Sequence, residues 1–597
     1  MVDVVIQVDR GRRWRRLREP VRVIDVRDAA DLVTALNDVE TFTSERGGHA
    51  AGFVTYEAGR AFGMRTCTPD PELPLAWFAL FDGRNVTEIP APSASDSYGV
   101  HSLAPSIDQS GFDHAFAKIR HHIGIGDTYQ VNYTFDLRGQ LSGDPFGLFA
   151  DLAGTQHGRY SAFIHTGTHA VCSASPELFF ARANGTLETR PMKGTARRGR
   201  TLAEDNDAAA RLRASAKERA ENVMIVDMMR NDLGRIAETG SVAVTDLLRV
   251  ERYPTVWQMT STVSARSSAT LAEIFAALHP SASITGAPKV RTMEIISELE
   301  RRPRGVYTGA IGYVSPGGAA QFNVGIRTAV IDLSTRVLTF GVGSGILWDS
   351  DPSSEYQECL LKAAIFGRRP QTFDLLETMR WTPSAGFFLL DRHIRRIHRS
   401  SVYFEYAWSE PDILRELDRA VAGKTGPQRV RLLLSRDGSV RIEATPLAPK
   451  SVLPAKLGIA LEPIDPSDIF LFHKTTQRSV YKNAALPDCD DVVLWTLHGD
   501  VTETTWGNIV VEIGGRKVTP PVETGLLAGT FREELLERGE IVEGRVRLED
   551  LKAASRVWII NSVREWWPAD VYIANAAATA PTSTSSATAT SANRNQR

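Results

Sequence analysis

The chain has 597 residues, of which 43% are hydrophobic and 23% are charged, and its formal net charge at pH 7 is −2. Because a single core seldom grows beyond roughly 250–300 residues, this length predicts two or more domains of ordinary globular composition. The nearly balanced charge gives no reason to expect a nucleic acid or an anionic membrane as a partner, and no run of about 18 apolar residues predicts a membrane span.

The cysteines and the N-terminal segment indicate the compartment. Cys67, Cys172, Cys359 and Cys489 lie far apart and form no Cys-x-x-Cys pair. Their spacing argues against a disulfide framework or a structural zinc site and fits a reducing compartment. Residues 1–17 carry arginines but lack the apolar core of a signal peptide. We therefore expect a cytoplasmic protein.

Strand-like and helix-like segments are mixed through the first 366 residues. A stretch rich in Pro, Ser and Ala at 90–110 predicts a surface loop. The hydrophobic patterns predict strands at 171–180, 307–314 and 337–340, and helices at 203–229, 291–301 and 355–366. Because these elements do not alternate regularly, we expect an α+β fold rather than a doubly wound parallel sheet.

The domain boundary and the tail are predicted from local composition. Residues 366–370, Phe-Gly-Arg-Arg-Pro, follow a helix-like run and precede a strand-like one. They predict a boundary between a first domain at 1–367 and a second at 371–575. Residues 576–597 are mostly Ala, Thr and Ser with almost no large apolar side chain, which predicts a disordered tail.

Two pairs of glutamates occur at helical spacing in the first domain. Glu218 and Glu221 are three residues apart, and Glu355 and Glu358 repeat this spacing, so each pair shares one helix face. Asp351 precedes Pro352 and is a candidate helix cap. Two such pairs facing each other across a cleft could hold Mg²⁺, which prefers oxygen ligands. Spacing alone favours the commoner alternative of four solvated surface glutamates.

Two glycine-rich segments are candidates for anion binding. One is Ile284-Thr-Gly-Ala-Pro-Lys289, ahead of a helix-like run, and the other is Gly341-Val-Gly-Ser-Gly345, after a strand-like run. Glycine-rich loops expose backbone N–H groups that can bind a carboxylate or a phosphate. Neither segment is a Walker or dinucleotide-binding motif, the glycine pattern is weak evidence by itself, and a tight turn is the alternative interpretation of each.

Taken together, these motifs resemble those of the chorismate-utilising enzymes, a family that includes the large subunits of anthranilate synthase and aminodeoxychorismate synthase. The resemblance runs from about residue 52 to residue 366. The motifs that carry it are Gly126-Asp-Thr-Tyr-Gln-Val-Asn132, Ser175-Pro-Glu177, Arg190-Pro-Met-Lys-Gly-Thr195, Glu221-Asn-Val-Met-Ile-Val-Asp227, Arg230-Asn-Asp-Leu-Gly-Arg235, Thr285-Gly-Ala-Pro-Lys289, Gly309-Ala-Ile-Gly-Tyr313, Phe322-Asn-Val-Gly-Ile-Arg327, Asp349-Ser-Asp-Pro352 and Glu355-Tyr-Gln-Glu358.

The resemblance implies a fold and a set of site residues for the first domain. The fold is a large α/β sandwich with the active site between its layers. The family's Mg²⁺ ligands correspond to Glu218, Glu221, Glu355 and Glu358. Its contacts to the substrate carboxylates correspond to Ser283, Thr285, Tyr313, Arg327, Gly343, Ser344 and Gly345.

Lys193 and Gln130 indicate the branch of this family. In aminodeoxychorismate synthases the lysine that corresponds to Lys193 is regarded as a nucleophile that adds to the chorismate ring before ammonia attacks, whereas anthranilate synthases usually carry a small residue there. Such a lysine needs desolvation or a local base to lose its proton. The alternative is a lysine that only pairs with a substrate carboxylate. The isochorismate- and salicylate-forming branches resemble this chain but place a lysine at Gln130, so the resemblance disfavours them.

One catalytic position departs from the family. A histidine usually follows the Tyr-Pro segment and is thought to help the ring hydroxyl to leave, but this chain has Gln258 there. Glutamine donates hydrogen bonds and cannot act as a general acid. The chain also lacks a Gly-x-Cys-x-Gly elbow, so we expect its ammonia to come from a separate glutamine amidotransferase subunit.

The second domain contains polar motifs that suit a cofactor. Gly529-Thr530, ahead of a helix-like run at 531–538, suits a phosphate at a helix N-terminus. A lysine among polar residues and a glutamate at a strand end suit an aldehyde-bearing cofactor and its pyridine nitrogen. The motifs are Thr372-Phe-Asp-Leu-Leu-Glu-Thr-Met-Arg380, Leu390-Asp-Arg-His-Ile-Arg-Arg-Ile-His-Arg-Ser-Ser401, His473-Lys-Thr-Thr-Gln-Arg478, Val501-Thr-Glu-Thr-Thr505 with Asn508, and Thr524-Gly-Leu-Leu-Ala-Gly-Thr-Phe-Arg532.

In this order the motifs resemble the fold-type IV pyridoxal-phosphate enzymes, which include branched-chain and D-amino-acid aminotransferases and aminodeoxychorismate lyase. The resemblance implies that Lys474 bonds to pyridoxal 5′-phosphate, with Lys482 as the alternative, and that Glu503 faces the pyridine nitrogen. It places Arg396, Gly529, Thr530 and Ser562 around the phosphate. Arg431 and Arg436, on a strand-like run at 429–436, are both candidates for holding substrate carboxylates.

Together the two resemblances imply two consecutive steps. Chorismate and ammonia give 4-amino-4-deoxychorismate, and elimination of pyruvate then gives 4-aminobenzoate for folate synthesis. One alternative is an anthranilate synthase-like component fused to a class IV aminotransferase. Another is a catalytically impaired homologue that binds the glutaminase. Dimerisation of the lyase domain stays open.

Overall fold

The computed structural model describes residues 2–93, 98–156, 158–366, 372–449 and 451–572. These residues form two compact units. The first comprises residues 1–198 and 206–371, and the second comprises residues 199–205 and 372–597. Most of the predicted boundary at 366–370 and the whole predicted tail at 576–597 lie outside the described residues.

The first unit contains two large, mostly antiparallel sheets. Sheet A is ordered β16 (Gly286–Ala287), β8 (Gln130–Ser142), β20 (Val337–Ile346), β19 (Thr328–Asp332), β10 (His169–Ser173), β9 (Ala162–His165), β1 (Asp3–Val8), β2 (Arg13–Arg18) and β6 (Val86–Ile89), with β7 (Gly99–Pro105) also paired with β8. Sheet B is ordered β13 (Met192–Arg197), β15 (Val256–Arg266), β12 (Thr186–Arg190), β11 (Leu178–Ala183), β18 (Ala320–Val324), β17 (Ala310–Val314), β4 (His49–Val54), β5 (Ala76–Phe81) and β3 (Arg22–Val26), with β14 (Ala243–Arg252) also paired with β15.

Seven α-helices lie wholly among the described residues of the first unit, and an eighth, α4, begins in residues that belong to the second unit. Their starts follow simple capping rules: Asp351 accepts a hydrogen bond from the Ser354 amide, and Thr270 and Glu273 form a capping box. The helices are α1 (Leu32–Ser44), α2 (Gln109–Gly124), α3 (Pro145–Gln156), α4 (Leu202–Ala214), α5 (Ala216–Gly234), α6 (Leu271–Leu278), α7 (Lys289–Glu300) and α8 (Pro352–Ala363).

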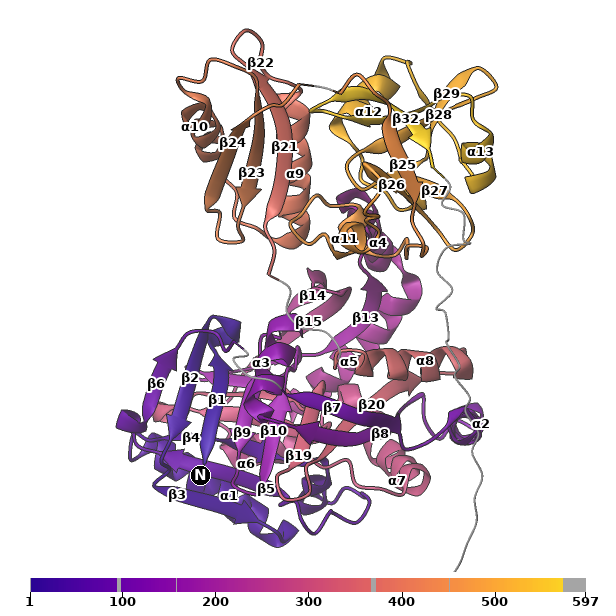
Figure 1. Ribbon diagram of the computed structural model, residues 1–597. Helices are drawn as coiled ribbons and strands as arrows, with labels where there is room; N and C mark the ends of the chain where they lie inside the picture. Colours follow the sequence, from indigo (N-terminus) through magenta and orange to yellow (C-terminus); the bar gives the residue numbers. More distant parts are fainter. Residues whose placement is uncertain (1, 94–97, 157, 367–371, 450, 573–597) are drawn as a thin grey trace, which may run out of the picture. The chain divides into compact units, whose positions relative to one another are not determined.

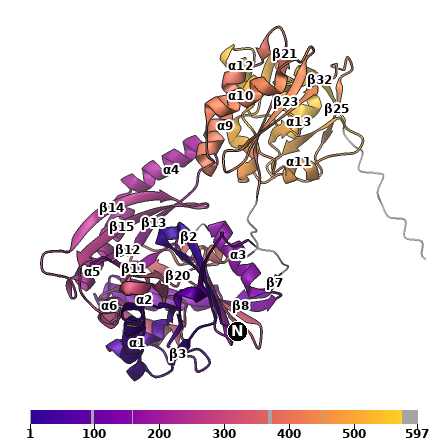
Figure 2. The ribbon, with the colours of Figure 1, turned by 90° about the vertical axis from the view of Figure 1, so that its left-hand side faces the viewer.

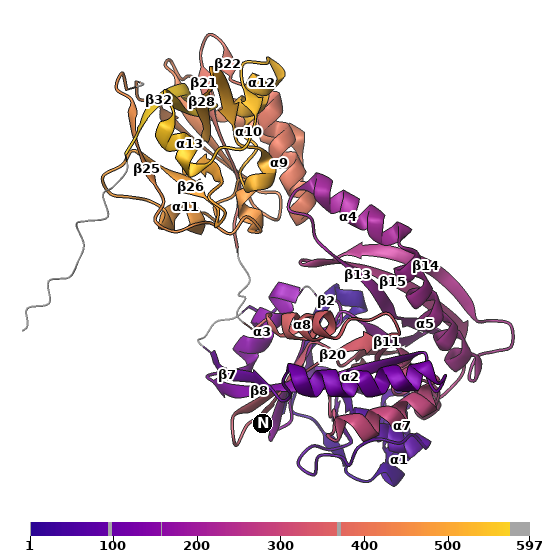
Figure 3. The ribbon, with the colours of Figure 1, turned by 90° about the vertical axis from the view of Figure 1, so that its right-hand side faces the viewer.

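Three apolar layers hold the first unit together. Side chains of β1, β2, β9 and β10 meet those of β4, β5 and β17, so sheets A and B pack face to face. Helices α2, α3 and α8 cover the outer face of sheet A (Figure 3), and α1, α5 and α6 cover that of sheet B (Figure 2). This arrangement confirms the predicted large sandwich, because each sheet buries one face on the other sheet and one on helices.

The structure corrects several predicted elements. The helix predicted at 203–229 is two helices, because Ser215 is extended and caps α5 with its hydroxyl. The stretch at 341–345 is not a loop, since β20 continues through it to Ile346. The run at 171–180 is interrupted between β10 and β11, and the predicted loop at 90–110 contains β7.

The second unit combines a small and a larger sheet with five α-helices among its described residues (Figure 1). The small sheet is ordered β22 (Gly386–Phe387), β21 (Leu375–Thr382), β23 (Gln428–Leu434) and β24 (Val440–Pro446). The larger is ordered β27 (Val501–Thr504), β26 (Asp491–Trp495), β25 (Ala455–Ile459), β32 (Glu565–Val571), β31 (Val557–Asn561), β28 (Asn508–Ile513), β29 (Arg516–Thr519) and β30 (Val542–Glu543). The helices are α9 (Leu390–Phe404), α10 (Glu410–Val421), α11 (Ser479–Asn483), α12 (Thr530–Glu537) and α13 (Leu548–Ala553).

This mixture of helices and separate sheets confirms the predicted α+β class for both units. No helix of the described chain is both long and apolar enough to cross a membrane.

Candidate active sites

The first candidate site lies where one edge of sheet B meets sheet A. Lys193 belongs to β13, the edge strand of sheet B, and its register with β15 shifts between Met192 and Thr195. Its ammonium nitrogen lies 3.2 Å from the point where a Cβ of Gly345 on β20 would be. Burial lowers the pKa of Lys193, while the charges of Glu221 and Glu177 act in the opposite direction. The structure therefore brings an amine of reduced basicity to the meeting point of the two sheets.

Glu177, for which the sequence motifs predicted no role, is a second titratable group at this point. Its side chain is 4% exposed, and the Ser283 hydroxyl donates a hydrogen bond to its Oε1 over 2.7 Å. Burial raises the pKa of Glu177 to about 7, opposed by the Ser283 hydrogen bond and the charge of Lys193. The carboxyl can therefore exchange a proton near neutral pH. Its position in the Ser175-Pro-Glu177 motif, directly before β11, was the available sequence signal.

The four predicted metal-binding glutamates lie on α5 and α8. Burial raises the pKa of Glu221, and the charges of Glu218 and Glu355 add to this effect while Lys193 opposes it. These carboxylates are therefore close enough to influence one another. Glu358 pairs with Lys362 over 2.9 Å. Within the described chain, no three acidic, histidine or cysteine side chains are close enough together to hold a metal ion.

Gly341, Gly343 and Gly345 alternate along β20 and so share one face of the strand. A Cβ on Gly345 would lie only 2.3 Å from Nε2 of Gln130. The absence of side chains on this face thus leaves room for Gln130 and Lys193. The side-chain oxygen of Gln130 is buried and has no hydrogen-bond partner among the described residues. Such an orphaned acceptor beside an amine marks a place where a polar ligand would be stabilised.

Arg327 is the strongest candidate for binding an anionic substrate. It adopts a left-handed backbone conformation with φ of 51°, and burial lowers the pKa of its guanidinium. Its Nη1 donates to the side-chain oxygen of Gln156. Within the described part of the chain no carboxylate forms an ion pair with Arg327, and Tyr253 is the one charge that acts on its pKa. A desolvated guanidinium without a counter-charge is stabilised by an incoming carboxylate.

The other residues predicted to contact the substrate have different surroundings. Ser283 is beside Glu177, and Ser344 on β20 is 3% exposed. The Thr285 hydroxyl donates to the Ser281 carbonyl over 3.1 Å.

Tyr313 lies in the core between the two sheets, where its hydroxyl interacts with Arg15 and His49. No described contact joins it to Lys193 or Arg327. A different tyrosine, Tyr307, packs against β20, because a Cβ on Gly341 would lie 2.1 Å from its ring.

The second candidate site is in the second unit, around Lys474. Burial and the charges of Arg396 and Arg478 lower the pKa of Lys474 to about 8. Glu503 on β27 is 3% exposed, and burial raises its pKa to about 7. The Tyr481 hydroxyl donates to its Oε1 over 2.8 Å. Lys482, the alternative lysine, is exposed on α11, so of these two lysines Lys474 is the one with a desolvated amine.

A connected polar network adjoins the start of α12. Arg396 on α9 binds the buried carboxylate of Glu377 through Nε at 2.8 Å and Nη2 at 2.6 Å. His393 lies between Glu377, at 2.6 Å, and the Thr530 hydroxyl, at 3.3 Å. Gly529 caps α12, and a Cβ there would lie 2.0 Å from Oδ1 of Asn508.

This arrangement fits a cofactor that carries an aldehyde, a pyridine nitrogen and a phosphate. An amine with a pKa near 8, a buried carboxyl and an arginine beside a helix N-terminus match these three groups in turn. The other predicted residues of this domain have contacts to different partners. The Ser562 hydroxyl donates to the Thr378 carbonyl over 3.3 Å, Arg431 pairs with Glu443 over 3.1 Å, and Arg436 lies over the Tyr406 ring.

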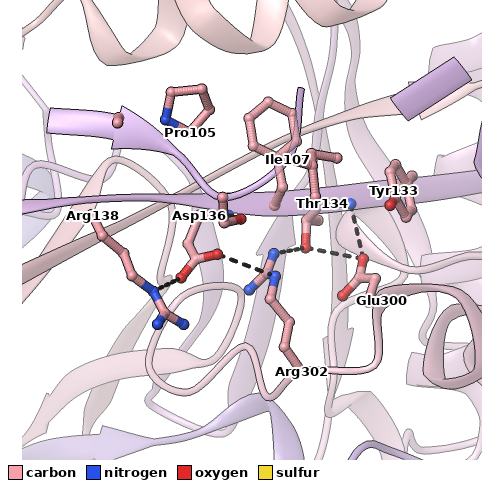
Figure 4. A pocket seen from close by; sticks show the side chains of 11 residues that line it. Pro105, Ile107, Tyr133, Thr134, Asp136, Arg138, Glu300 and Arg302 are labelled. Carbon is pink, nitrogen blue, oxygen red and sulfur yellow. Dashed lines mark hydrogen bonds and ion pairs between the residues drawn. The ribbon is translucent and has the colours of Figure 1, made fainter. Parts of the chain in front are cut away.

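A cavity of about 540 Å³ elsewhere in the first unit contains none of the predicted site residues (Figure 4). Its charged side chains are paired with neighbours. Arg138 and Arg302 both contact the Asp136 carboxylate, at 2.7 and 3.4 Å, and the Thr134 hydroxyl donates to Glu300 over 3.0 Å.

Comparison with known proteins agrees with the two-part organisation. The sequence model described as chorismate binding enzyme matches residues 5–368, and that described as amino-transferase class IV matches residues 374–572. The chain is 42% identical over 261 residues to an aminodeoxychorismate synthase of Streptomyces griseus, covering 43% of this chain and 36% of that protein. It is 38% identical over 282 residues to aminodeoxychorismate synthase component 1 of Bacillus subtilis, covering 47% of this chain and 60% of that protein.

The chain thus spans between about a third and three fifths of the length of these two relatives. Among solved structures, anthranilate synthase component I from Streptococcus pneumoniae matches with a TM-score of 0.52 and 28% identity. That match covers 61% of this chain and 92% of the other, which agrees with the sandwich fold of the first unit.

Proposed function

The chain belongs to the family of chorismate binding enzymes, and we propose that it makes 4-aminobenzoate in two steps. The first domain, 1–367, converts chorismate and ammonia to 4-amino-4-deoxychorismate. The second, 371–575, eliminates pyruvate from this compound. The relatives named aminodeoxychorismate synthase support the first step, and the class IV aminotransferase match supports the second. The product serves folate synthesis, and both steps take place in the cytoplasm.

The observation that carries this proposal is the buried amine of Lys193 beside Glu177. Burial disfavours the charged form of the lysine, so its neutral form becomes accessible. Glu177, with a pKa of about 7, is a suitable acceptor for the lysine proton at neutral pH. The amine of Lys193 and the carboxyl of Glu177 are close enough to act on each other, so they can serve as a nucleophile and its base.

The first reaction then proceeds by two displacements. The nitrogen of Lys193, which has given its proton to Glu177, forms a bond to a ring carbon of chorismate. The ring double bonds shift toward the carbon that bears the hydroxyl, and the hydroxyl leaves as water after it accepts the proton from Glu177; the double bonds shift back in the second displacement. Ammonia next forms a bond at the carbon that lost the hydroxyl, and the lysine leaves with its bonding electrons. Arg327 holds a substrate carboxylate during both steps. The open acceptor of Gln130 is suited to the N–H groups of the incoming ammonia.

Mg²⁺ fits the donor chemistry of Glu218, Glu221, Glu355 and Glu358, since all four provide hard oxygen ligands. Bound Mg²⁺ supplies positive charge that neutralises a substrate carboxylate. The charges of Lys193 and Lys217 act on Glu221 and Glu358, and Lys362 pairs with Glu358.

Replacing Glu358 by glutamine is expected to abolish most amination, because it removes one negative charge from the ion site. Amination rates measured against Mg²⁺ concentration should show at least a roughly tenfold higher requirement for the ion, in line with the dependence of metal sites on ligand charge. Glu298→Gln, at an exposed glutamate paired with Arg65, is the matched control. The lyase step, assayed with supplied 4-amino-4-deoxychorismate, should survive. Equal loss of both activities would contradict two independent sites.

Pyridoxal 5′-phosphate fits the second site, where Lys474 would bond to its aldehyde and Glu503 would face its pyridine nitrogen. The chemistry that it supplies when bound is the withdrawal of electrons by its ring. Lys474 moves a proton at the substrate carbon that bears the amino group, and Glu503 holds a proton at the pyridine nitrogen. Arg396, Gly529, Thr530 and Ser562 are our candidates for the phosphate.

Ammonia comes from a separate glutamine amidotransferase subunit, because the chain has no Gly-x-Cys-x-Gly elbow. The purified chain is expected to make 4-aminobenzoate from chorismate and ammonium at alkaline pH, where free ammonia is more abundant. With glutamine it should make product only after a glutaminase subunit is added. Chromatography of the products with each nitrogen source tests this. Turnover of glutamine by the chain alone would contradict it.

A further inference from the structure

Both polar groups of the Gln258 side-chain amide, on β15, form hydrogen bonds with the neighbouring strand β13. Its Nε2 donates a hydrogen bond to the carbonyl of Gly194 over 2.8 Å. Its Oε1 accepts a hydrogen bond from the Thr195 hydroxyl over 3.0 Å. The donor and the acceptor of the amide are thus both used on β13, one and two residues beyond Lys193.

The backbone that Gln258 contacts is irregular. The register of β13 against β15 shifts between Met192 and Thr195, and Gly194 has a φ of 91°, which favours glycine. Irregularities of this kind turn a side chain out of the ladder and commonly occur beside active sites. Because ladder pairing is interrupted here, the orientation of Lys193 depends on other contacts.

Side-chain amides supply these contacts on two successive peptide groups. Nδ2 of Asn222 on α5 donates to the Lys193 carbonyl over 3.1 Å, and Gln258 holds the next carbonyl. Asn222 is itself fixed, because the Ser261 hydroxyl donates to its Oδ1 over 2.5 Å. The two successive peptide groups that follow Lys193 are therefore held by a residue of helix α5 and by a residue of strand β15.

We infer that Gln258 is a positioning residue that fixes the irregular backbone of Lys193 and does not supply a proton to the substrate. This inference rests on the proposed amination of chorismate. An amide cannot act as a general acid, and both of its hydrogen-bonding groups are directed at β13. The proton of the leaving hydroxyl is then supplied by Glu177, which lies at the same site. In this chain the residue at the position of the family's histidine thus positions the backbone of the catalytic lysine.

The first test removes the contact between Gln258 and β13 by changing the residue on either strand. Gln258→Leu should lower kcat for amination about 10- to 100-fold, because a displacement of about 1 Å at a reacting group can cost 10²-fold. The KM for chorismate should change less than about twofold, since no contact to the substrate is removed. Thr195→Val should lower kcat more mildly. The double variant should be no worse than Gln258→Leu, because both changes remove parts of one contact.

The second test asks whether the position can supply a proton. Gln258→His should give no kcat above that of the unmodified enzyme and no new ionisation between about pH 6 and 7, where histidine titrates. A faster histidine variant whose kcat falls as this group loses its proton would overturn the inference. An unchanged kcat in Gln258→Leu would overturn it as well.

A control variant and the unmodified enzyme distinguish failure of this inference from failure of the proposed function. Gln321→Leu removes another half-buried glutamine of sheet B that donates to a backbone carbonyl, that of Gln7, over 3.0 Å, and should leave kcat near its reference value. Lyase activity in the same preparations reports folding of the chain. If the unmodified enzyme fails to aminate chorismate, the proposed function falls. If it aminates chorismate and the Gln258 variants behave like Gln321→Leu, only the positioning role falls.

Discussion

Lys193→Ala is expected to lose formation of 4-amino-4-deoxychorismate by more than about 10⁴-fold, because it removes the attacking nitrogen. A misplaced acid or base usually costs only about 10²–10⁴-fold. Chorismate should still bind through Arg327, which the substitution leaves in place. The measurement is chromatographic analysis of products from chorismate and ammonium at fixed enzyme concentration.

The variant Lys193→Arg tests whether Lys193 acts as a nucleophile or only supplies a positive charge. Arginine keeps the positive charge but is protonated at any accessible pH, so it cannot attack. Near-normal product from this variant would end the covalent proposal and leave chorismate binding untouched. Lys217→Ala removes an exposed charge that acts on the same carboxylates, and we expect it to have a small effect.

The pH dependence of amination provides a further readout of the same residue. The neutral amine is the reactive form, so the rate should rise with pH as Lys193 loses its proton. Because burial lowers the pKa of Lys193, this rise should begin at a lower pH than for a solvent-exposed lysine, whose pKa is about 10.4. The rising limb should be absent from the residual activity of Lys193→Ala.

Lys474→Ala is expected to abolish the lyase step and the covalent retention of pyridoxal phosphate after reduction with borohydride. The unmodified protein should be yellow, and mass spectrometry of its peptides should locate the label on Lys474. Since the pKa of Lys474 is about 8, capture of the cofactor should slow as the pH falls below 8 and the amine gains a proton. At pH 7.5 far more of this lysine is neutral than of an ordinary one.

Lys482→Ala is the matched control for this prediction. Lys482 is exposed on α11, so its removal should leave both the label and the lyase rate intact. Amination by the first unit should be unaffected in both variants. Labelling of Lys482 would show that the assignment of Lys474 is wrong. Unmodified protein that stays colourless when supplied with pyridoxal phosphate would refute the cofactor for the whole second unit.

The local chemistry of the chain was readable from its sequence. Helical spacing placed Glu218 with Glu221 and Glu355 with Glu358, and the structure has them on α5 and α8. Asp351 caps α8 as predicted, because a carboxylate ahead of a proline in the first turn satisfies an otherwise free N–H. The mixed order of elements predicted the α+β class. The glutamate pairs and the helix cap depend on contacts within a few residues, and the class depends on the order of the elements along the chain.

Where a sequence pattern is compatible with two local conformations, the tertiary structure determines which one forms. The glycines of 341–345 suit a loop or a strand equally well, and pairing with β8 made them a strand whose bare face accommodates Gln130 and Lys193. Tyr313 and Tyr307 are six residues apart in one segment. Packing puts Tyr313 between the sheets and Tyr307 against Gly341, a difference that depends on partners distant in sequence.

By itself the sequence determined which chemical groups the protein has and which of them share a helix face, because these follow from residue identity and backbone periodicity. It did not determine the acidity of those groups. Glu177 has a pKa of about 7 and Lys474 one of about 8 only because distant strands and helices exclude water from them. Nor did it reveal that Gln258 holds the backbone of Lys193, since that contact joins residues 64 positions apart. Desolvation and long-range pairing arise only when the sheets are assembled.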